Sequence, residues 1–313
     1  MIDIIIVNWN AGRQLVNAVS SIALNHQSLI SCVIIVDNTS TDNSLAHVEA
    51  LSDLPFKLQI VRNEVNRGFG AACNQGAALV KSQYLLFLNP DTLLFANSVK
   101  GALDFMQHPA NAKVGIVGIQ LLDENNHIAR SCARFPTFLT IIAQVIGLNR
   151  LPGFTHNNTH MVDWDHNKTV AVDHVIGAFY MIRRHIFESL GGFDERFFVY
   201  LEDLDLSLRT HKLGWRSVFL ANVQAFHAGG GTSRQVKAHR LFYSMRSRLL
   251  YGFKHFTSTQ AWFILILSLG LEPISRVVYA LMRGEKGDVI NTLKAYYMLF
   301  ADLRETLKKT AMT

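Results

Sequence analysis

The sequence predicts an α/β protein in which a mostly parallel central sheet, flanked by helices, precedes a C-terminal helical extension. Over the first half of the chain, short apolar runs alternate with stretches of helical period, which is the pattern of βαβ units. After Gly231 the chain turns basic and helical. We therefore expect a catalytic or binding domain over residues 1–255 and a helical extension over residues 256–313.

Each expected element of the first half is marked by its apolar spacing. The expected strands are Asp3–Asn8, Cys32–Asp37, Leu58–Arg62, Tyr84–Asn89 and Val114–Ile119. The expected helices are Arg13–Leu24, Ser44–Leu51, Ala71–Val80 and Ala96–Gln107. Such sheets bind ligands beyond the carboxyl ends of their strands, so the polar residues at those ends are candidates for a site.

The second half is less regular. Between Leu122 and Asp173 only a segment near Phe138–Ile146 has helical spacing, and the rest is expected to be loop. The later ordered segments are Val175–Ile182, a helix over Glu202–Leu213, strands near Ser217–Leu220 and Ala225–His227, an apolar run over Ala261–Leu271 and an amphipathic helix over Asp288–Lys309. Glu272-Pro273 closes the apolar run.

Composition excludes several classes of protein. Hydrophobic residues make up 49% of the 313 residues and charged residues only 17%, against about 25% charged on average, which rules out disorder and coiled coil. The net charge of +6 suits nucleic acid, anionic lipid or phosphate-bearing substrates, without choosing among them. A mean hydropathy of +0.16 is high for a freely soluble protein and raises the question of a membrane surface.

The cysteines and the N-terminus point to a reducing compartment. Cys32, Cys73 and Cys132 are far apart and form no CxxC pair, so neither a zinc knuckle nor a disulfide framework is indicated. The first residues have no basic stretch and include Asp3, unlike a secretory signal. We therefore expect a cytoplasmic protein with buried, reduced thiols.

Two aspartates follow expected strands. Asp37 ends the second strand, where a carboxylate accepts hydrogen bonds from a nucleobase imide or a ribose hydroxyl, or caps the next helix. Asp91 follows the fourth strand in the sequence Asn89-Pro90-Asp91. There it could hold a divalent ion beside a diphosphate, although Asn-Pro-Asp is equally good turn chemistry.

Two glycine-rich segments are candidates for anion binding. The segment Arg67-Gly68-Phe69-Gly70 is interpreted as a tight turn entering a helix, where backbone N–H groups and the arginine could face an anion. A plain glycine turn explains it equally well. His227 precedes three glycines, and its imidazole is either a metal ligand or a structural group.

Three acidic residues, Glu202, Asp203 and Asp205, open the helix expected over Glu202–Leu213. Acids in a first turn complement the helix dipole. They also follow the aromatic loop Gly191–Phe198, and a carboxylate beside such a loop could act as a general base toward a sugar or another polar acceptor.

Taken together, these motifs resemble the family-2 glycosyltransferases, and among them the bacterial rhamnosyltransferases of cell-surface polysaccharide assembly. The resemblance covers roughly residues 2–255. It is carried by Val7-Asn8-Trp9-Asn10, Val36–Asp42, Asn63–Gly70, Asn89-Pro90-Asp91, Gly191–Glu195, Tyr200–Asp205 and His227. It implies a GT-A fold, a dTDP- or UDP-sugar donor, a divalent cation (Mg²⁺ or Mn²⁺) and inversion at the anomeric carbon.

The resemblance also assigns roles to residues. Asn8, Asp37, Arg67, Gly68 and Asp91 bind the donor, Asp91 and His227 hold the metal, Asp203 is the catalytic base, and Glu202 binds the acceptor. This chain has Asn89 in place of the first acid of the family's DxD motif, so metal binding by this motif depends on one carboxylate. The resemblance implies transfer from dTDP-L-rhamnose or a similar donor to a lipid-linked saccharide or glycan.

Two other functions are compatible with parts of the sequence. One is a nucleotidyltransferase that makes a sugar nucleotide, but the first strand is followed by Asn8–Gly12 and not by a basic, glycine-rich loop. The other is a non-catalytic protein that binds nucleic acid or membrane through its positive charge. That function gives no role to Asp91, Glu202 and Asp203, and we expect no nucleic-acid partner.

The end of the chain predicts peripheral contact with an anionic membrane. Residues 234–254 contain basic residues and no acid, and the uncharged run Phe256–Leu271 follows. That run is shorter than the ~20 residues needed to span a bilayer, so its helices are expected to lie in the interface with basic side chains on the headgroups. The alternative is that these helices simply pack on the catalytic domain. Membrane contact would place the enzyme at the inner face of the plasma membrane.

Overall fold

The computed structural model describes residues 1–26, 28–150, 159–229 and 236–311. The chain forms two compact units. Unit 1 comprises residues 1–134, 164–195 and 202–232, and unit 2 comprises residues 135–163, 196–201 and 233–313.

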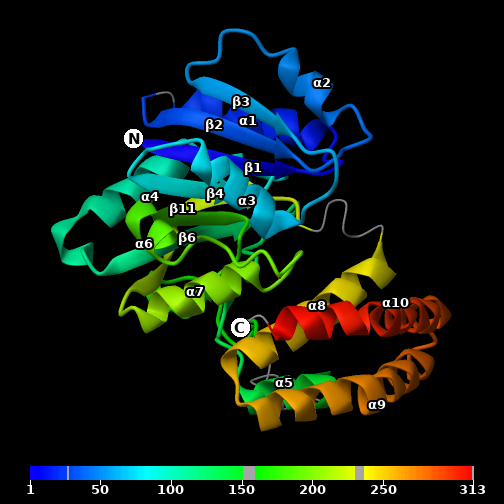
Figure 1. The fold of residues 1–313 in the computed structure, drawn as a ribbon. Coiled ribbons are helices and arrows are strands. Elements are labelled where there is room, and N and C mark those ends of the chain that lie inside the picture. Colours follow the sequence, from blue (N-terminus) through cyan, green and yellow to red (C-terminus); the bar gives the residue numbers. More distant parts are fainter. Residues whose placement is uncertain (27, 151–158, 230–235, 312–313) are drawn as a thin grey trace. The chain divides into compact units, whose positions relative to one another are not determined.

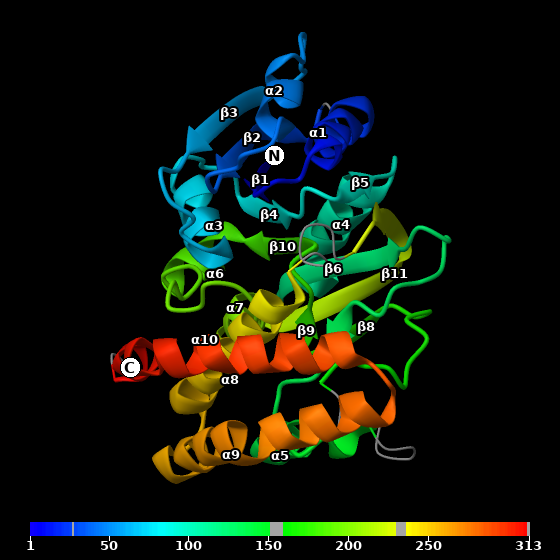
Figure 2. The same cartoon turned by 90° about the vertical axis from the view of Figure 1, so that its right-hand side faces the viewer.

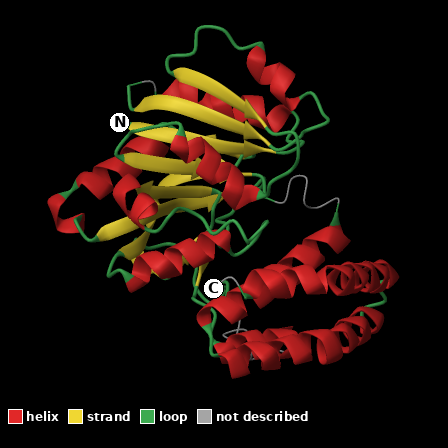
Figure 3. Cartoon of the chain, viewed as in Figure 1, coloured by secondary structure: helices red, strands yellow, loops and turns green. Residues whose placement is uncertain are grey.

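Unit 1 is built on a mostly parallel sheet, which confirms the predicted α/β class (Figures 1 and 3). In the order of the sheet, the strands are β3 (Lys57–Arg62), β2 (Ile30–Asp37), β1 (Ile2–Asn8), β4 (Tyr84–Leu88), β10 (Phe179–Arg183), β6 (Val114–Leu122), β11 (Arg216–His227) and β5 (Thr92–Leu94), with β8 (Val170–Val172) paired to β11. Strands β3, β2, β1 and β4 are parallel, whereas β10 runs antiparallel between β4 and β6.

The central strands are apolar because both faces of the sheet are covered. All seven residues of β1 are buried. Ile4 and Ile6 belong to the main core, while Ile5 points to the opposite face, where it meets α3 (Phe69–Ala78) at Gly76. A Cβ at Gly76 would lie 2.6 Å from Ile5, so glycine allows α3 to lie directly on the sheet.

The other helices of unit 1 are α1 (Arg13–Asn25), α2 (Ser44–Glu49), α4 (Ser98–Gln107), α6 (Arg184–Ser189) and α7 (Glu202–Lys212). Most of them match the predicted ranges to within two residues. Strand β5 and helix α6 were not predicted, because three and six residues are too short for a period to show.

The sequence patterns misplaced some boundaries. The ordered segment Val175–Ile182 is two strands, β9 (His174–Val175) and β10, separated at Gly177. The two strands expected near residues 217–227 are one strand, β11, whose pairing with β6 shifts between Leu220 and Gln224. The region expected to be mainly loop also contains β7 (Cys132–Ala133), which pairs with β9, and β8.

Unit 2 is helical (Figure 2). It contains α5 (Phe138–Val145), α8 (Lys237–His255), α9 (Ser258–Met282) and α10 (Lys286–Thr310). Helix α9 contacts α5, α8 and α10. Helix α8 is thus grouped with the C-terminal helices, and the functional division at residue 255 stays a prediction.

Glu272-Pro273 closes the apolar run but does not end the helix, since α9 continues through Pro273 to Met282. An internal proline costs about 3 kcal/mol, and tertiary contacts of the preceding residue offset this cost. The Glu272 carboxylate is fully buried, pairs with Arg248 of α8, and accepts a 2.9 Å hydrogen bond from Arg276 Nε. Within the described residues, α9 is also the helix long and apolar enough to cross a bilayer.

Candidate active site

The carboxyl edge of β1 and β2 carries Asn8 and Asp37, both buried. Asn8 Nδ2 donates to Asp37 Oδ1 (2.7 Å) and approaches the hydroxyls of Ser40 (3.0 Å) and Ser44 (2.8 Å). Asp37 Oδ2 accepts from the backbone N–H of Ser40 (3.1 Å). The amide of Asn8 is therefore directed into the protein, where it orients Asp37 and the loop that follows β2.

A network of amide side chains, missed by the sequence analysis, positions the turn at Arg67-Gly68. Asn38 Nδ2 donates to the carbonyl of Gly68 (3.0 Å), and Asn38 Oδ1 accepts from Asn63 Nδ2 (2.9 Å). Asn66 Oδ1 accepts from the Gly68 N–H (2.9 Å). Gly68 has φ of 86°, a conformation that favours glycine. Its backbone is thus fixed beside the end of β2 by side chains from separate segments.

The loop between α6 and α7 is held by Asn74 of α3. Its amide exchanges two hydrogen bonds with the backbone of Phe193, each 2.9 Å long, and also donates to Glu195. Gly192 has φ of 75°, and a Cβ there would lie 2.5 Å from Asn74 Oδ1, so glycine is required. Half-exposed Arg67 lies 3.8 Å from Glu195, which brings the predicted donor turn next to this loop.

Asp91 and His227 are brought together as predicted for a shared metal site. His227 Nε2 lies 3.3 Å from Asp91 Oδ1 and 3.5 Å from Asn89 Nδ2. The two side chains are about nine-tenths buried, at 12% and 11% exposure. Their proximity follows from the pairing of β5 with the end of β11. Residues 230–234, the rest of the glycine run that was considered for phosphate binding, lie outside the described residues.

Asp91 and His227 fit a divalent cation only if a ligand supplies further oxygens. No group of three or more His, Cys, Asp or Glu side chains suited to a metal occurs in the part of the chain that the structure describes. Mg²⁺ and Mn²⁺ accept one or two protein carboxylates together with substrate phosphates. The residues present therefore suit a cation that binds with a diphosphate.

Asp203 lies in the first turn of α7 and is fixed by backbone donors. Its Oδ2 accepts from the N–H of Gly177 (2.8 Å), and its Oδ1 accepts from the N–H of Leu204 (2.8 Å). The side chain remains 18% exposed. Asp205, two residues further along, is fully buried and paired with Arg209 of the same helix. Of these two acids, Asp203 is the one accessible to a ligand.

Glu202 occupies a different environment from Asp203. It is buried, and among the described residues its Oε2 has no hydrogen-bond partner. Burial, and then the neighbouring charge of Asp203, raise the pKa of Glu202 well above its usual range. Burial also raises the pKa of the Cys73 thiol, with smaller contributions from Glu202 and Asp203. Neutral Glu202 can therefore donate a hydrogen bond, while Asp203 accepts one.

Two consecutive residues before α7 have a strained backbone. Tyr200 and Leu201 have φ of 68° and 67°, which is unusual for non-glycine residues and most costly for bulky ones. Such strain is concentrated at functional sites. In the sequence, only the cluster of acids that follows marks this segment as a candidate site. The positive φ angles of Tyr200 and Leu201 could not be predicted.

The structure links several of the predicted site residues. The Gly177 N–H binds Asp203, while the carbonyl of the next residue, Ala178, accepts from the Asn89 N–H (3.1 Å). Residues 177–178 thus connect the predicted base to the Asn89–Asp91 turn. A Cβ at Gly70 would lie 3.6 Å from Glu202 Cβ, so the start of α3 lies against the start of α7. Sequence analysis did not find residues 177–178, because nothing in their type marks them.

Comparison with known proteins identifies the family to which a chain with this sheet and these acids belongs. Residues 3–191 match the family model described as glycosyl transferase family 2. This match covers more than half of the chain, so the protein belongs to the family-2 glycosyltransferases. The suggested resemblance to the family-2 glycosyltransferases is confirmed.

The chain is also similar to rhamnosyltransferases. It is 24% identical over 256 residues to the N-acetylglucosaminyl-diphospho-decaprenol L-rhamnosyltransferase of Mycobacterium tuberculosis. The aligned region covers 76% of this chain and 80% of the relative. It is 30% identical over 173 residues to the rhamnosyltransferase WbbL of Escherichia coli K12. This aligned region covers 51% of this chain and 60% of the relative.

Solved structures show the same fold. The mannosyltransferase PcManGT of Pyrobaculum calidifontis, in complex with GDP-Man and Mn²⁺, aligns with a TM-score of 0.57 and 15% identity, covering 99% of this chain and 86% of that one. Residues 1–349 of S. aureus TarS align with a TM-score of 0.53 and 13% identity, covering 96% and 91%. The predicted GT-A fold is confirmed.

Proposed function

We propose that this glycosyltransferase inverts the anomeric centre and transfers L-rhamnose from dTDP-L-rhamnose to a lipid-linked saccharide or glycan in cell-surface polysaccharide synthesis. One observation carries the reaction type. The accessible carboxylate of Asp203 is joined to the Asn89–Asp91 turn through Gly177 and Ala178, so a base and a diphosphate site belong to one hydrogen-bonded framework.

The reaction needs one base and no enzyme nucleophile. Asp203 takes the proton of the acceptor hydroxyl as that oxygen forms a bond to the anomeric carbon. The bond from this carbon to the diphosphate oxygen breaks in line, and the nucleoside diphosphate leaves with the electron pair. Glu202, kept neutral by burial and by Asp203, is placed to donate a hydrogen bond to the acceptor.

The donor's nucleotide is assigned to the strand edge. Asp37 is oriented by Asn8, and Arg67 and Gly68 are held at the adjacent turn. Asp91 and His227 would hold a divalent cation, which would supply positive charge to the departing diphosphate. The solved structure of PcManGT in complex with GDP-Man and Mn²⁺ supports the presence of such a cation.

The sugar and the acceptor are inferred from the relatives. Both rhamnosyltransferases named above transfer rhamnose by name, and the name of the mycobacterial relative includes a polyprenyl-diphosphate acceptor. Because identity is only 24–30%, these names support the choice of substrates to test first.

A sugar-nucleotide panel tests the function. The purified protein is incubated with dTDP-L-rhamnose, UDP-glucose, UDP-N-acetylglucosamine and GDP-mannose, with Mg²⁺ or Mn²⁺ and a short-chain polyprenyl-diphosphate N-acetylglucosamine. We expect acceptor-dependent release of dTDP, and a β-linked product from a β-linked donor would contradict inversion. Release of pyrophosphate would instead indicate a nucleotidyltransferase.

We also propose that unit 2 attaches the enzyme peripherally to the inner face of an anionic membrane. Helices α9 and α10 each expose one apolar face. The exposed large side chains on α9 include Trp262, Phe263, Ile266, Leu271, Ile274, Val278 and Leu281, and those on α10 are Ile290, Leu293, Tyr297 and Phe300. Those on α10, and Leu271, Ile274, Val278 and Leu281 of α9, recur every three or four residues, as on a helix lying in an interface.

The burial of Glu272 argues against a spanning helix. Its carboxylate lies fully buried in the middle of α9 and is paired with Arg248 of a neighbouring helix, and a charge in the hydrocarbon core is costly.

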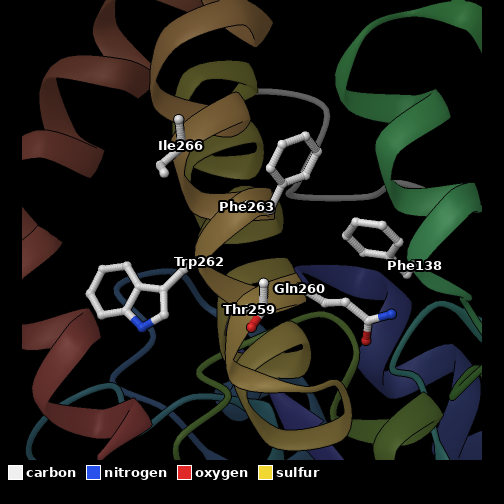
Figure 4. A pocket seen from close by; sticks show the side chains of 6 residues that line it. All are labelled: Phe138, Thr259, Gln260, Trp262, Phe263 and Ile266. Carbon is white, nitrogen blue, oxygen red and sulfur yellow. The ribbon is translucent and has the colours of Figure 1, made fainter.

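Phe138 and Phe263 line a shallow apolar groove of about 560 Å³ together with Ile266 (Figure 4). Such a groove suits an apolar lipid chain at the surface.

Liposome sedimentation tests the attachment with matched variants. We expect the full-length protein to pellet with vesicles that contain phosphatidylglycerol and high salt to weaken this only in part. Replacing Ile266 and Ile274 by serine should abolish pelleting, because their exposed side chains (64% and 60%) would no longer insert. Replacing Leu24 and Val65, which are 79% and 66% exposed in unit 1, is the control. Protein that stays in the supernatant at low salt would refute the attachment.

A further inference from the structure

We propose that His174 is a positioning residue that holds the Asp203 carboxylate for proton transfer, at the end of a buried chain of hydrogen-bonding groups beginning at Tyr180. The inference rests on the proposed function, because it takes Asp203 to be the general base. His174 lies on β9, Tyr180 on β10, and Ser207 one helical turn after Asp203 on α7.

Short distances connect these side chains. His174 Nε2 lies 3.6 Å from Asp203 Oδ2, and His174 Nδ1 lies 2.9 Å from the Ser207 hydroxyl. The Tyr180 hydroxyl is 3.0 Å from the same Ser207 oxygen. His174, Tyr180 and Ser207 are buried, whereas Asp203 is 18% exposed. This series of hydrogen-bonding side chains therefore leads from the interior of unit 1 to a carboxylate that a ligand can reach.

The chemistry of the groups gives this chain one direction. Burial raises the pKa of Tyr180 far above its usual range, so the phenol stays neutral and can donate a hydrogen bond to the Ser207 oxygen. The Ser207 hydroxyl then donates to His174 Nδ1, which leaves the imidazole proton on Nε2, facing Asp203. The opposite order would place a nitrogen lone pair against a carboxylate, and that arrangement is repulsive.

Two N–H groups consequently converge on one oxygen of the base. Gly177 N–H already donates to Asp203 Oδ2 at 2.8 Å, and His174 Nε2–H approaches the same atom. A separation of 3.6 Å exceeds a hydrogen bond, but catalytic hydrogen bonds are often long in ligand-free enzymes and tighten once substrate is bound. Both donors stabilise the ionised carboxylate and fix its plane toward the acceptor.

Several titratable or charged groups of the described residues lie near Asp203 and His174. They include Cys73, Tyr180, Glu202, Asp205 and Arg209, with Cys132 on the strand paired to β9. Burial keeps the thiols and Glu202 neutral, and Asp205 is paired with Arg209.

The test compares two replacements of His174 across the pH range. His174→Leu removes the donor, whereas His174→Gln keeps an N–H near the position of Nε2. With dTDP-L-rhamnose and the polyprenyl-diphosphate acceptor, we expect His174→Leu to lower kcat about 10- to 100-fold, with little change in the donor KM. The acid limb of its pH–rate profile should move to higher pH, because the ionised base has lost a donor. His174→Gln should recover part of both effects.

His166→Gln is the matched control. His166 is also fully buried, and its Nε2 accepts from the Cys132 N–H (3.2 Å), so this variant tests the loss of a buried imidazole away from Asp203. We expect it to lose stability without moving the acid limb. An unchanged acid limb in both His174 variants of an active enzyme would overturn the positioning role alone. A wild-type enzyme that transfers no sugar would overturn the proposed function, and this inference with it.

Discussion

Replacing Asp203 by asparagine distinguishes a catalytic role from a structural one, because the expected loss of turnover is larger than the expected loss of folding stability. The carboxylate accepts one backbone N–H at each oxygen, from Gly177 and from Leu204. Whichever way the amide of the variant turns, its NH₂ group faces one of these N–H donors. One hydrogen bond is lost, and we expect a loss of stability of about 1–3 kcal/mol.

The effect on turnover should be larger. Loss of a general base lowers the rate on the order of 10²- to 10⁴-fold, which corresponds to about 2.7–5.5 kcal/mol of transition-state stabilisation. Binding of the nucleoside diphosphate should survive, because the strand-edge residues Asp37, Arg67 and Asp91 are unchanged.

The assay measures dTDP release at saturating acceptor, together with a thermal-shift titration of dTDP in the presence of Mg²⁺. An Asp203→Asn enzyme that binds dTDP normally and retains near-normal turnover would refute the assignment of the base. An enzyme that has lost dTDP binding as well would show that the substitution acts on the fold of the site.

Three further predictions concern single side chains. Asp91→Ala should weaken dTDP binding with Mg²⁺ or Mn²⁺ but not in EDTA, as measured by calorimetry; an equal loss in EDTA would indicate a structural role. Glu202 has a raised folded-state pKa, caused first by burial and then by Asp203, so its contribution to stability is present below the unfolded pKa and lost as pH rises through the folded value. Glu202→Gln should therefore gain stability relative to wild type between pH 5 and pH 8 in urea unfolding, and a pH-independent difference would contradict a buried neutral acid. Glu272→Gln should cost about 3–5 kcal/mol, because it leaves buried Arg248 unpaired, whereas Asp104→Asn, at an exposed pair, should cost less than ~1 kcal/mol; similar losses in the two variants would show that the buried pair is unimportant.

The sequence by itself determined the parallel half of the sheet and the chemistry at its edge. Strands such as β1 and β4 are buried on both faces, so their residues are apolar apart from Asp3 in β1, and their ends are marked by polar residues. Asp37 and Asp91 could be singled out because a strand end is a local feature. The first turn of α7 was predicted to be part of the site in the same way, from three acids at the start of a helical period.

Only the tertiary structure decided how these pieces meet. The link through Gly177 and Ala178, and the approach of His174 to Asp203, depend on β9 and β10, whose pairing partners lie far away in the sequence. The continuation of α9 through Pro273 likewise depends on a partner from α8. A local pattern records which face of an element is apolar and where the element ends, but it holds no information about partners dozens of residues away. Those partners bring Asp203, His174 and the Asn89–Asp91 turn into one framework.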